Sequence, residues 1–306
     1  MLFENAGGKG AVCRDQTRAL QVLFDGDRAY GVRAQTTGGD AEEMHAPVVI
    51  DATGQQSMIL HRLGLREEIP GLRKASIWAY YRGARRDPGV DEGATIILFT
   101  RDKNCWFWYI PLFDDTASVG LVSDTDHLLK GRGTPESVFE EELCNCPAVL
   151  GRLMNAELVS DFRVLRDFSY VSKRPAGPGW VLVGDAFGFL DPIYSSGVFF
   201  ALKSGELAAD CVVDALQNDD PSPERLGRWA EEFSQGVNWM RKLVHAFYTT
   251  EFSFGRFIRE FPHHKKNLTD LLVGKIFHPG AGDIFNDMDP WLQEAREKAA
   301  GDKPAK

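Results

Sequence analysis

The segment from Gly179 to Asp210, GWVLVGDAFGFLDPIYSSGVFFALKSGELAAD, constrains the fold of this chain more than any other. Its first apolar run ends in Gly184-Asp185, a pattern typical of a buried strand. A proline and two serines follow, and then a long apolar stretch begins at helical spacing. The segment therefore predicts a buried strand, a turn and a helix, in that order, as in α/β folds.

The residues between this strand and this helix suit a ligand. Asp185 can accept hydrogen bonds from ribose-like hydroxyl groups, and Gly184 lets a ligand approach the backbone. Pro192 presets the turn, and the helix begins near Ser195–Gly197, where N–H groups and the helix dipole favour anions. An acidic residue and two serines that only cap a core helix explain the same pattern equally well. These residues alone leave both interpretations open.

The rest of the chain divides by composition. The segments ALQVLFD, RAYGVRAQTT and EMHAPVVIDATG predict three strands, and the last ends in small residues that leave room for a ligand. Residues 73–163 are rich in aromatic and β-branched residues and predict an antiparallel β-rich domain. We therefore expect an α/β domain built from residues 1–72 and 164–216, an inserted domain over 73–163, and a helical region over 217–306.

Composition excludes several classes of function. The chain has 35 basic and 44 acidic residues, a formal net charge of −9, which argues against a nucleic-acid partner. Its apolar runs are shorter than the roughly 18 residues that a membrane span requires. Five scattered cysteines fit a reducing cytoplasm. We expect no metal site: Cys144-Asn-Cys146 has no second pair, and His263–Lys266 is more simply a solvated basic turn. Glu140–Glu142 is interpreted as a solvated helix face.

Three motifs resemble those of the flavin-dependent halogenases. VGDAFGFLDPIYSSGVFFAL resembles their second FAD-binding motif, and VVIDATG resembles the strand end that lines their cofactor site. Trp106-Phe-Trp108-Tyr-Ile110-Pro111 fits Trp-x-Trp-x-Ile-Pro, the signature that separates these halogenases from flavin monooxygenases. An ordinary strand with Trp106, Trp108 and Ile110 on one buried face explains this third match in isolation. The three matches together, in register over most of the chain, favour the halogenase family.

The resemblance implies a Rossmann-type FAD-binding domain of the aromatic-hydroxylase kind, with a β-rich substrate domain inserted into it and helices at its C-terminal end. It implies that FAD is held by Asp51, Gly54, Gly184, Asp185, Pro192, Ser195, Ser196 and Gly197. It places the halide on the backbone N–H groups of Ser196 and Gly197. Trp106, Trp108, Ile110 and Pro111 correspond to residues near the tunnel between flavin and substrate.

The reaction implied is halogenation of an electron-rich aromatic compound by oxygen, chloride or bromide, and reduced flavin from a separate reductase. Tryptophan halogenases have a glutamate just before the serine of the motif. This sequence has Tyr194 there, which favours a phenolic or carrier-bound substrate. A flavin monooxygenase and a geranylgeranyl-reductase-like oxidoreductase share the Gly-Asp motif and remain alternatives.

The sequence also lacks the dinucleotide-binding fingerprint of the family. It contains no Gly-x-Gly-x-x-Gly, and MLFENAGGKGAVCR resembles a helix and strand from the middle of the family's FAD-binding domain. We therefore expect the FAD-binding domain to be incomplete here, with roughly a hundred preceding residues that carry the family's catalytic lysine. A non-catalytic remnant of a halogenase is the further alternative.

Overall fold

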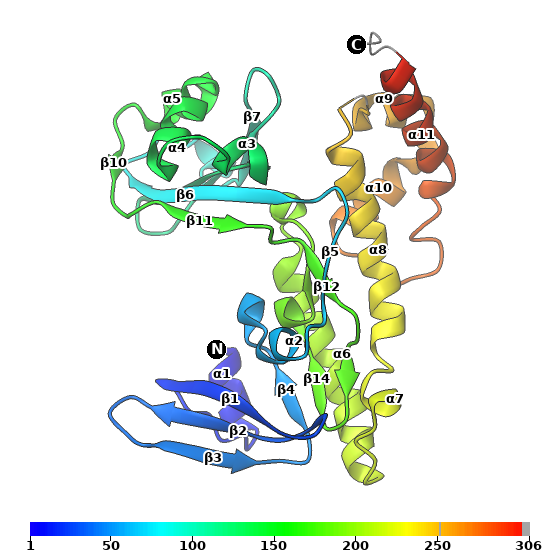
Figure 1. Ribbon diagram of the computed structural model, residues 1–306. Helices are drawn as coiled ribbons and strands as arrows, with labels where there is room; N and C mark the ends of the chain where they lie inside the picture. Colours follow the sequence, from blue (N-terminus) through cyan, green and yellow to red (C-terminus); the bar gives the residue numbers. More distant parts are fainter. Residues whose placement is uncertain (251, 302–306) are drawn as a thin grey trace. The chain divides into compact units, whose positions relative to one another are not determined.

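The computed structural model describes residues 1–250 and 252–301. These fall into two compact units, one comprising residues 1–67 and the chain from residue 171 onward, the other residues 68–170 (Figure 1). Strands β5 (Arg66–Glu68) and β12 (Tyr170–Ser172) lie where the chain passes from one unit to the other, and with β15 (Gly188–Phe189) they form a three-stranded sheet. The helices after residue 217 group with the first unit.

The first unit begins with helix α1 (Leu2–Gly8) and an antiparallel sheet in the order β1-β2-β3. Its strands are β1 (Thr17–Asp25), β2 (Arg28–Thr36) and β3 (Ala41–His45). The third strand expected from the sequence is in fact two, because β3 ends at His45 and β4 (Val49–Asp51) joins another sheet. Pro47 lies between them, and a proline has no N–H to donate to a ladder. The prediction of one continuous strand was therefore wrong.

The buried strands of the first unit form a small sheet in the order β13-β14-β4, with β13 (Ala176–Gly177) and β14 (Trp180–Leu182). β14 runs parallel to β4, and Leu182 pairs with Asp51. The two strands therefore end side by side. Each is followed by a 3₁₀ turn and then a helix: η1 (Gly54–Gln56) and α2 (Met58–Arg62) after β4, and η3 (Gly184–Ala186), η4 (Pro192–Tyr194) and α6 (Gly197–Gln217) after β14. The predicted strand, turn and helix of residues 179–210 are confirmed.

Helices follow α6 to the end of the described chain. They are α7 (Pro223–Leu226), α8 (Ala230–Phe247), α9 (Phe254–Glu260), η5 (Pro262–His264), α10 (Lys265–Leu272) and α11 (Phe285–Gly301). Phe233, Met240 and Val244 recur at helical spacing on α8 and are buried, as the apolar periodicity predicts. Phe233 packs edge-on against Phe200 of α6, with ring centroids 5.9 Å apart, so α6 and α8 share a core.

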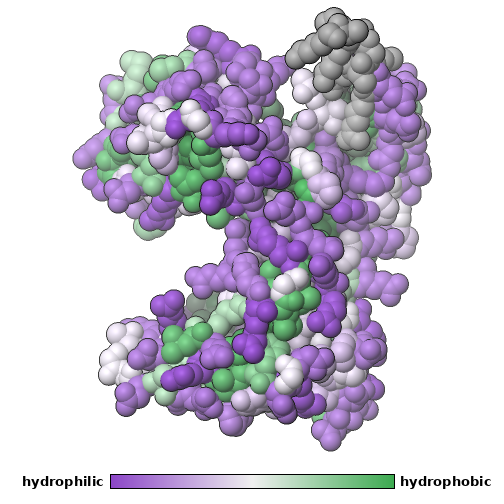
Figure 2. All heavy atoms as spheres, viewed as in Figure 1, coloured by the Kyte–Doolittle hydropathy of each residue, from purple (hydrophilic) through white to green (hydrophobic). Residues whose placement is uncertain are grey.

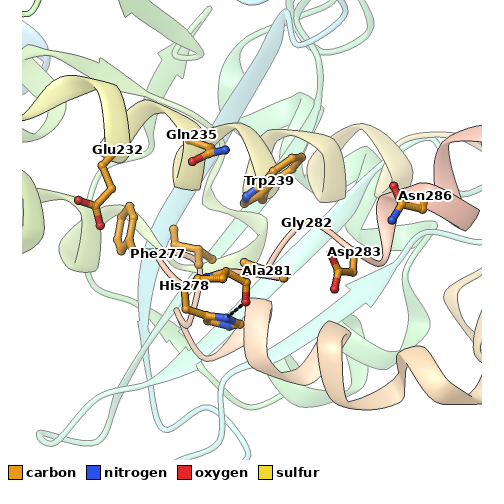
Figure 3. A pocket seen from close by; sticks show the side chains of 12 residues that line it. Glu232, Gln235, Trp239, Phe277, His278, Ala281, Gly282, Asp283 and Asn286 are labelled. Carbon is orange, nitrogen blue, oxygen red and sulfur yellow. Dashed lines mark hydrogen bonds between the residues drawn. The ribbon is translucent and has the colours of Figure 1, made fainter.

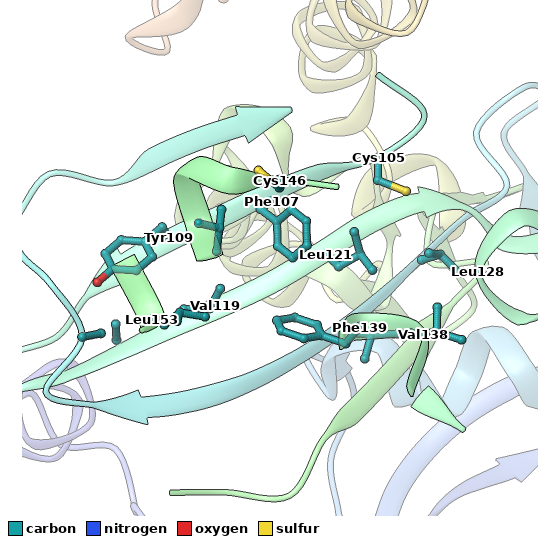
Figure 4. Packing of buried hydrophobic residues seen from close by; sticks show 14 of the residues in the cluster. Cys105, Phe107, Tyr109, Val119, Leu121, Leu128, Val138, Phe139, Cys146 and Leu153 are labelled. Carbon is teal, nitrogen blue, oxygen red and sulfur yellow. The ribbon is translucent and has the colours of Figure 1, made fainter. Parts of the chain in front are cut away.

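The second unit is built on an antiparallel sheet in the order β10-β6-β9-β8-β7, with β11 also paired to β6. The strands are β6 (Lys74–Arg82), β7 (Ile96–Phe99), β8 (Trp106–Pro111), β9 (Thr116–Asp124), β10 (Glu157–Leu158) and β11 (Arg163–Arg166). Its helices are η2 (Gly89–Asp91), α3 (Thr125–Leu129), α4 (Pro135–Cys144) and α5 (Pro147–Leu153). One face of the sheet buries Phe107, Tyr109 and Leu121 against Phe139 and Val138 of α4 (Figure 4). The antiparallel, β-rich character expected of this region is confirmed.

One residue of the acidic run on α4 is not solvated. The side chain of Glu142 is buried and accepts hydrogen bonds from Arg132 (2.8 Å) and His127 (3.1 Å). Burial raises the pKa of Glu142, but the hydrogen bonds from Arg132, Asn145 and His127 outweigh it, and the pKa lies below its usual value. The solvated helix face predicted for these glutamates was therefore wrong at Glu142, which lies on the side of α4 that faces the unit's interior.

The surface of the molecule is mostly hydrophilic on the face drawn in Figure 2, with hydrophobic residues gathered in separate areas. Large apolar side chains that are exposed include Ile50 on β4 and Val198, Leu202 and Val213 on α6. Across residues 1–250 and 252–301, we find no helix that combines the length and the apolar character needed to cross a membrane.

Candidate functional site

A cavity of about 390 Å³ lies where β4 and β14 end. It is lined by Ala52, Gly54, Val183, Gly184, Asp185, Phe189, Gly197, Val198 and Ala201. The lining comes from the turns after the two parallel strands and from the first turns of α6. Ligands of open α/β sheets bind beyond the carboxyl ends of the strands, so this cavity stands where such a fold places its ligand. It brings together four residues that the sequence singled out, Gly54, Gly184, Asp185 and Gly197.

The two turn glycines have backbone conformations that other residues rarely adopt. Gly54 has a φ of 64° and Gly184 a φ of 56°, both in the left-handed region. A Cβ atom on Gly184 would lie 3.2 Å from Cβ of Ala201, in the cavity wall. The N–H of Gly184 donates to Oγ of Ser204 (2.9 Å), which fixes the turn to α6. Because Gly184 has no side chain, its backbone atoms form this part of the cavity surface, and a ligand can approach them directly.

Asp185 provides a carboxylate in a cavity whose lining is otherwise apolar or backbone. Burial raises the pKa of this carboxyl above its usual value. A ligand hydroxyl that donates to the carboxylate would offset this desolvation. The aromatic ring of Phe189 forms another part of the lining. The cavity can therefore hold a ligand that is partly flat and apolar and partly hydroxylated, which fits the ring and ribityl chain of a flavin.

Asp51 lies outside the lining of this cavity. Its Oδ1 accepts hydrogen bonds from the N–H and the hydroxyl of Thr53 (3.0 and 2.6 Å), and its Oδ2 accepts from the N–H of Ile59 (2.8 Å). The side chain is buried, and its bonds close the turn between β4 and α2. We therefore infer that these bonds hold Ala52 and Gly54, which line the cavity, in place.

The start of α6 adjoins the cavity. Gly197, Val198 and Ala201 line it, whereas Pro192, Ser195 and Ser196 lie outside the lining. Ser195 is left-handed, with a φ of 52°, and Ser196 is the N-cap residue, with no side-chain capping bond to any residue that the structure describes. The first N–H groups of a helix have no carbonyl partner within it and carry its positive dipole end. This end of α6 is thus suited to an anion.

Helix α8 holds the turn that leads into α6. The hydroxyl of Tyr248 donates to Oδ2 of the buried Asp191 (3.1 Å), and Oδ1 of Asp191 accepts from the N–H of Ile193 (2.9 Å). The hydroxyl of Tyr194 donates to the carbonyl of Leu243 (3.2 Å), and burial raises the pKa of Tyr194 well above its usual value. Sequence reasoning missed the hydrogen bond between Tyr248 and Asp191 because it links distant elements.

The tryptophans of the second unit lie on the sheet face opposite to the Phe107 core. The rings of Trp106 and Trp108 are 6.2 Å apart, and Trp78 of β6 lies 6.3 Å from Trp108. The indole N–H of Trp108 donates to the hydroxyl of Ser118 (3.1 Å). Trp106 is buried, while Trp108, Ile110 and Pro111 are half-buried. The alternation read from the sequence places Trp106, Trp108 and Ile110 on one face, and the strand geometry agrees.

A second cavity, of about 420 Å³, contains none of the residues that the sequence singled out (Figure 3). It lies between α8 and the loop before α11, and Glu232, Gln235 and Trp239 line its helical side. Trp239 covers Gly282, where an added Cβ would lie 2.5 Å from its ring. Because no strand of the described chain ends at this cavity, we place the candidate flavin site in the first cavity.

Comparisons with known proteins show the family to which the sequence is similar. The sequence model of the family described as tryptophan halogenase matches residues 2–276. A 1H-pyrrole-2-carbonyl peptidyl-carrier-protein chlorinase from Pseudomonas fluorescens is 28% identical over 292 residues, which are 94% of this chain and 65% of the chlorinase. Sulochrin halogenase from Aspergillus terreus is 35% identical over 255 residues, covering 75% of this chain and 46% of that enzyme. The chain thus spans about half to two thirds of the length of these relatives.

Solved structures show the same fold. The flavin-dependent brominase Bmp2 has a TM-score of 0.83 and 26% identity, and the match covers 95% of this chain and 73% of Bmp2. Halogenase PltM in complex with phloroglucinol and FAD has a TM-score of 0.72 at 18% identity, covering 98% of this chain and 67% of PltM. Because the family model extends over most of the sequence, this chain belongs to the tryptophan halogenase family of flavin-dependent halogenases.

Proposed function

We propose that this protein acts in the FAD-dependent halogenation of an electron-rich aromatic compound, with oxygen and chloride or bromide as co-substrates. The observation that carries the proposal is the cavity at the ends of β4 and β14, where Gly54, Gly184, Asp185 and Gly197 meet. Relatives named as a chlorinase, a brominase and a halogenase support the same chemistry.

The residues of the cavity would divide the binding of reduced flavin between them. Asp185 accepts hydrogen bonds from the ribityl hydroxyls, and Gly184 lets the ribityl chain approach the backbone. Pro192 and Ser195 shape the turn beside the ring, and the N–H groups of Ser196 and Gly197 bind the halide. Reduced flavin, when bound, would give two electrons to oxygen, and the halide would give the other two and so be oxidised to the hypohalous acid, with water as the second product.

The lining of the cavity suits the ribityl chain and the ring of FAD, and the sequence carries no Gly-x-Gly-x-x-Gly for its pyrophosphate. We therefore expect riboflavin, FMN and FAD to bind this chain with similar affinities. Quenching of flavin fluorescence on titration with protein measures all three. FAD that binds far more tightly than riboflavin would contradict this assignment, because the adenylate half would then supply most of the binding.

The substrate we propose is phenolic or bound to a carrier protein. Tyr194 stands where tryptophan halogenases have a glutamate, and its buried hydroxyl donates to the carbonyl of Leu243. A pyrrole on a peptidyl carrier protein and sulochrin appear in the names of relatives. Trp106 and Trp108, with Ile110 and Pro111, would line the path to this substrate. A separate reductase would supply the reduced flavin, and the five free thiols fit a cytoplasmic location.

The test supplies the protein with a flavin reductase, NADH, FAD, oxygen and bromide or chloride, together with phenols and a carrier-bound pyrrole. A halide-dependent mass shift with the halogen isotope pattern is the expected result. A hydroxylated or hydrogenated product would instead indicate a monooxygenase or a reductase, and the absence of both flavin binding and turnover would indicate a non-catalytic protein. Asp185→Ala should lose flavin, whereas Trp106→Phe should keep flavin and change the product distribution.

A further inference from the structure

We propose that His263, His264 and Asp287 form a binding site for a divalent transition-metal ion, with Zn²⁺ as the preferred ion. Each of the three side chains offers one ligand atom, and these atoms all lie within 4.8 Å of one another. The sequence suggested only a basic turn at residues 263–266, because the carboxylate comes from α11, later in the chain. The site is separate from the flavin cavity, so it does not depend on the proposed halogenation.

The ligand atoms converge on one oxygen. Nε2 of His264 lies 2.8 Å from Oδ2 of Asp287, and Nε2 of His263 lies 3.6 Å from the same oxygen. Ligand atoms around a tetrahedral zinc ion, with bonds of about 2.0–2.2 Å, are about 3.3–3.5 Å apart, so small side-chain rotations would place all three around one ion. A hydrogen bond to Asp287 explains the position of one imidazole, that of His264. A cation shared with Asp287 explains the positions of both imidazoles.

The surroundings hold the buried ligand in position and leave the others accessible. The side chain of His264 is 6% exposed, and its ring stacks on Phe257 with an interplanar angle of 9° and centroids 5.9 Å apart. His263 is 64% exposed and Asp287 is 39% exposed, so an ion can reach them and keep a water ligand. A rigid first ligand with two accessible ones is a practical arrangement for capturing an ion from solution.

Two further acidic residues lie near Asp287. A cavity of about 400 Å³ adjoins Asp287, and the carboxylates of Glu260 and Glu294 also line it. Lys266, which follows the two histidines closely, is engaged in an ion pair with Asp270. Two imidazoles and one carboxylate select Zn²⁺, Co²⁺ or Ni²⁺ over Mg²⁺ or Ca²⁺, which prefer oxygen ligands.

A bound ion would connect two parts of the helical region. His263 and His264 belong to η5, which leads into α10, and Asp287 lies in the first turn of α11. Because the unfolded chain does not hold these ligands together, an ion that binds only the folded state raises the unfolding temperature. We therefore assign the site a structural role, as a clamp between η5 and α11.

The experiment uses the whole chain, stripped of metal with a chelator. Zn²⁺ titrated in a calorimeter should bind at one site per chain, Co²⁺ should give the visible absorption of a tetrahedral complex, and Zn²⁺ should raise the unfolding temperature until chelator is added. His263→Gln changes a largely exposed residue and should weaken Zn²⁺ binding more than about tenfold, the loss that even outer ligand partners cause. Asp287→Asn should do the same, and His45→Gln, in a separate sheet, should not.

Two outcomes would overturn the proposal. In the first, the parent protein binds no Zn²⁺ and shows no change in unfolding temperature, and the cluster is then a hydrogen-bonded link between His264 and Asp287. In the second, Zn²⁺ binds equally well to the parent and to His263→Gln, so the ion occupies another place. Flavin titration of the same variants separates this result from the proposed function, since neither substitution touches the flavin cavity.

Discussion

Replacement of Gly120 by alanine tests whether the indole of Trp108 lies where the structure places it. Gly120, on β9, is the direct cross-strand partner of both Trp108 on β8 and Trp78 on β6. A Cβ atom on Gly120 would lie 2.0 to 2.4 Å from three ring atoms of Trp108. Atoms cannot approach so closely, so the indole must leave its position over the glycine.

The size of the effect follows from three contributions. Overpacking of a well-packed site costs about 1–3 kcal/mol. Movement of the indole also breaks its hydrogen bond to Ser118, worth about 0.5–1.5 kcal/mol. Alanine in place of glycine in a strand raises the free energy of unfolding by about 0.5–1 kcal/mol, because the unfolded chain then has lower conformational entropy. Gly120→Ala should therefore lower the free energy of unfolding by about 0.5–4 kcal/mol, with the middle of the range near about 2 kcal/mol.

Urea unfolding followed by tryptophan fluorescence measures this change, and near-UV circular dichroism reports the packing of the indoles. Gly151→Ala is the matched control, because no described atom lies within 4 Å of an added Cβ there. Gly151 lies in α5 of the same unit, and alanine should stabilise that helix by up to about 1 kcal/mol. If Gly120→Ala is as stable as the parent and has an unchanged near-UV spectrum, the indole does not cover Gly120 and the reasoning fails.

Three further substitutions test the flavin cavity. Gly184→Ala adds a Cβ at a residue with a φ of 56° and places it 3.2 Å from Ala201, which costs about 1–2 kcal/mol of strain. This substitution should weaken flavin binding about tenfold in fluorescence titrations. The control Gly205→Ala should leave binding unchanged, because an added Cβ there has no neighbour within 4 Å among the described residues. Burial raises the pKa of Asp185, so the folded state holds its proton longer than the unfolded state does. The stability of the flavin-free protein should therefore fall as pH rises from the ordinary aspartate pKa through the raised value, and Asp185→Asn should remove this slope in denaturation measured across pH. Tyr248→Phe removes the hydroxyl that donates to the buried Asp191. The free energy of unfolding should fall by about 1–3 kcal/mol, and the turnover rate should depend less on the halide concentration. Unchanged stability would contradict this role of Tyr248.

Local patterns in the sequence predicted the parts of this structure that depend on neighbouring residues. The alternation around Trp106 fixed which residues share a strand face, and the apolar spacing after Ser196 fixed α6. Contacts between residues far apart in the sequence could not be predicted from such local patterns. Glu142 stands in a run of three glutamates, and only the position of Arg132 and His127 shows that it is the buried one. Asp287 becomes a partner of His264 only after the chain has turned back on itself.

The two aspartates at the strand ends show how this limit affects the candidate site. Both were expected to bind the cofactor, yet Asp51 is the last residue of β4 and pairs with Leu182, whereas Asp185 lies three residues beyond Leu182. The N–H of Val183 still donates to the carbonyl of Asp51 (3.1 Å), and the turns that follow, η1 with Gly54 and η3 with Asp185, contact each other. Asp51, at the end of its strand, caps the backbone of the turn that follows it, and Asp185, within the turn after β14, lines the cavity. The distance of each acidic residue from its strand end, together with the parallel register, therefore decides which of the two carboxylates lines the cavity.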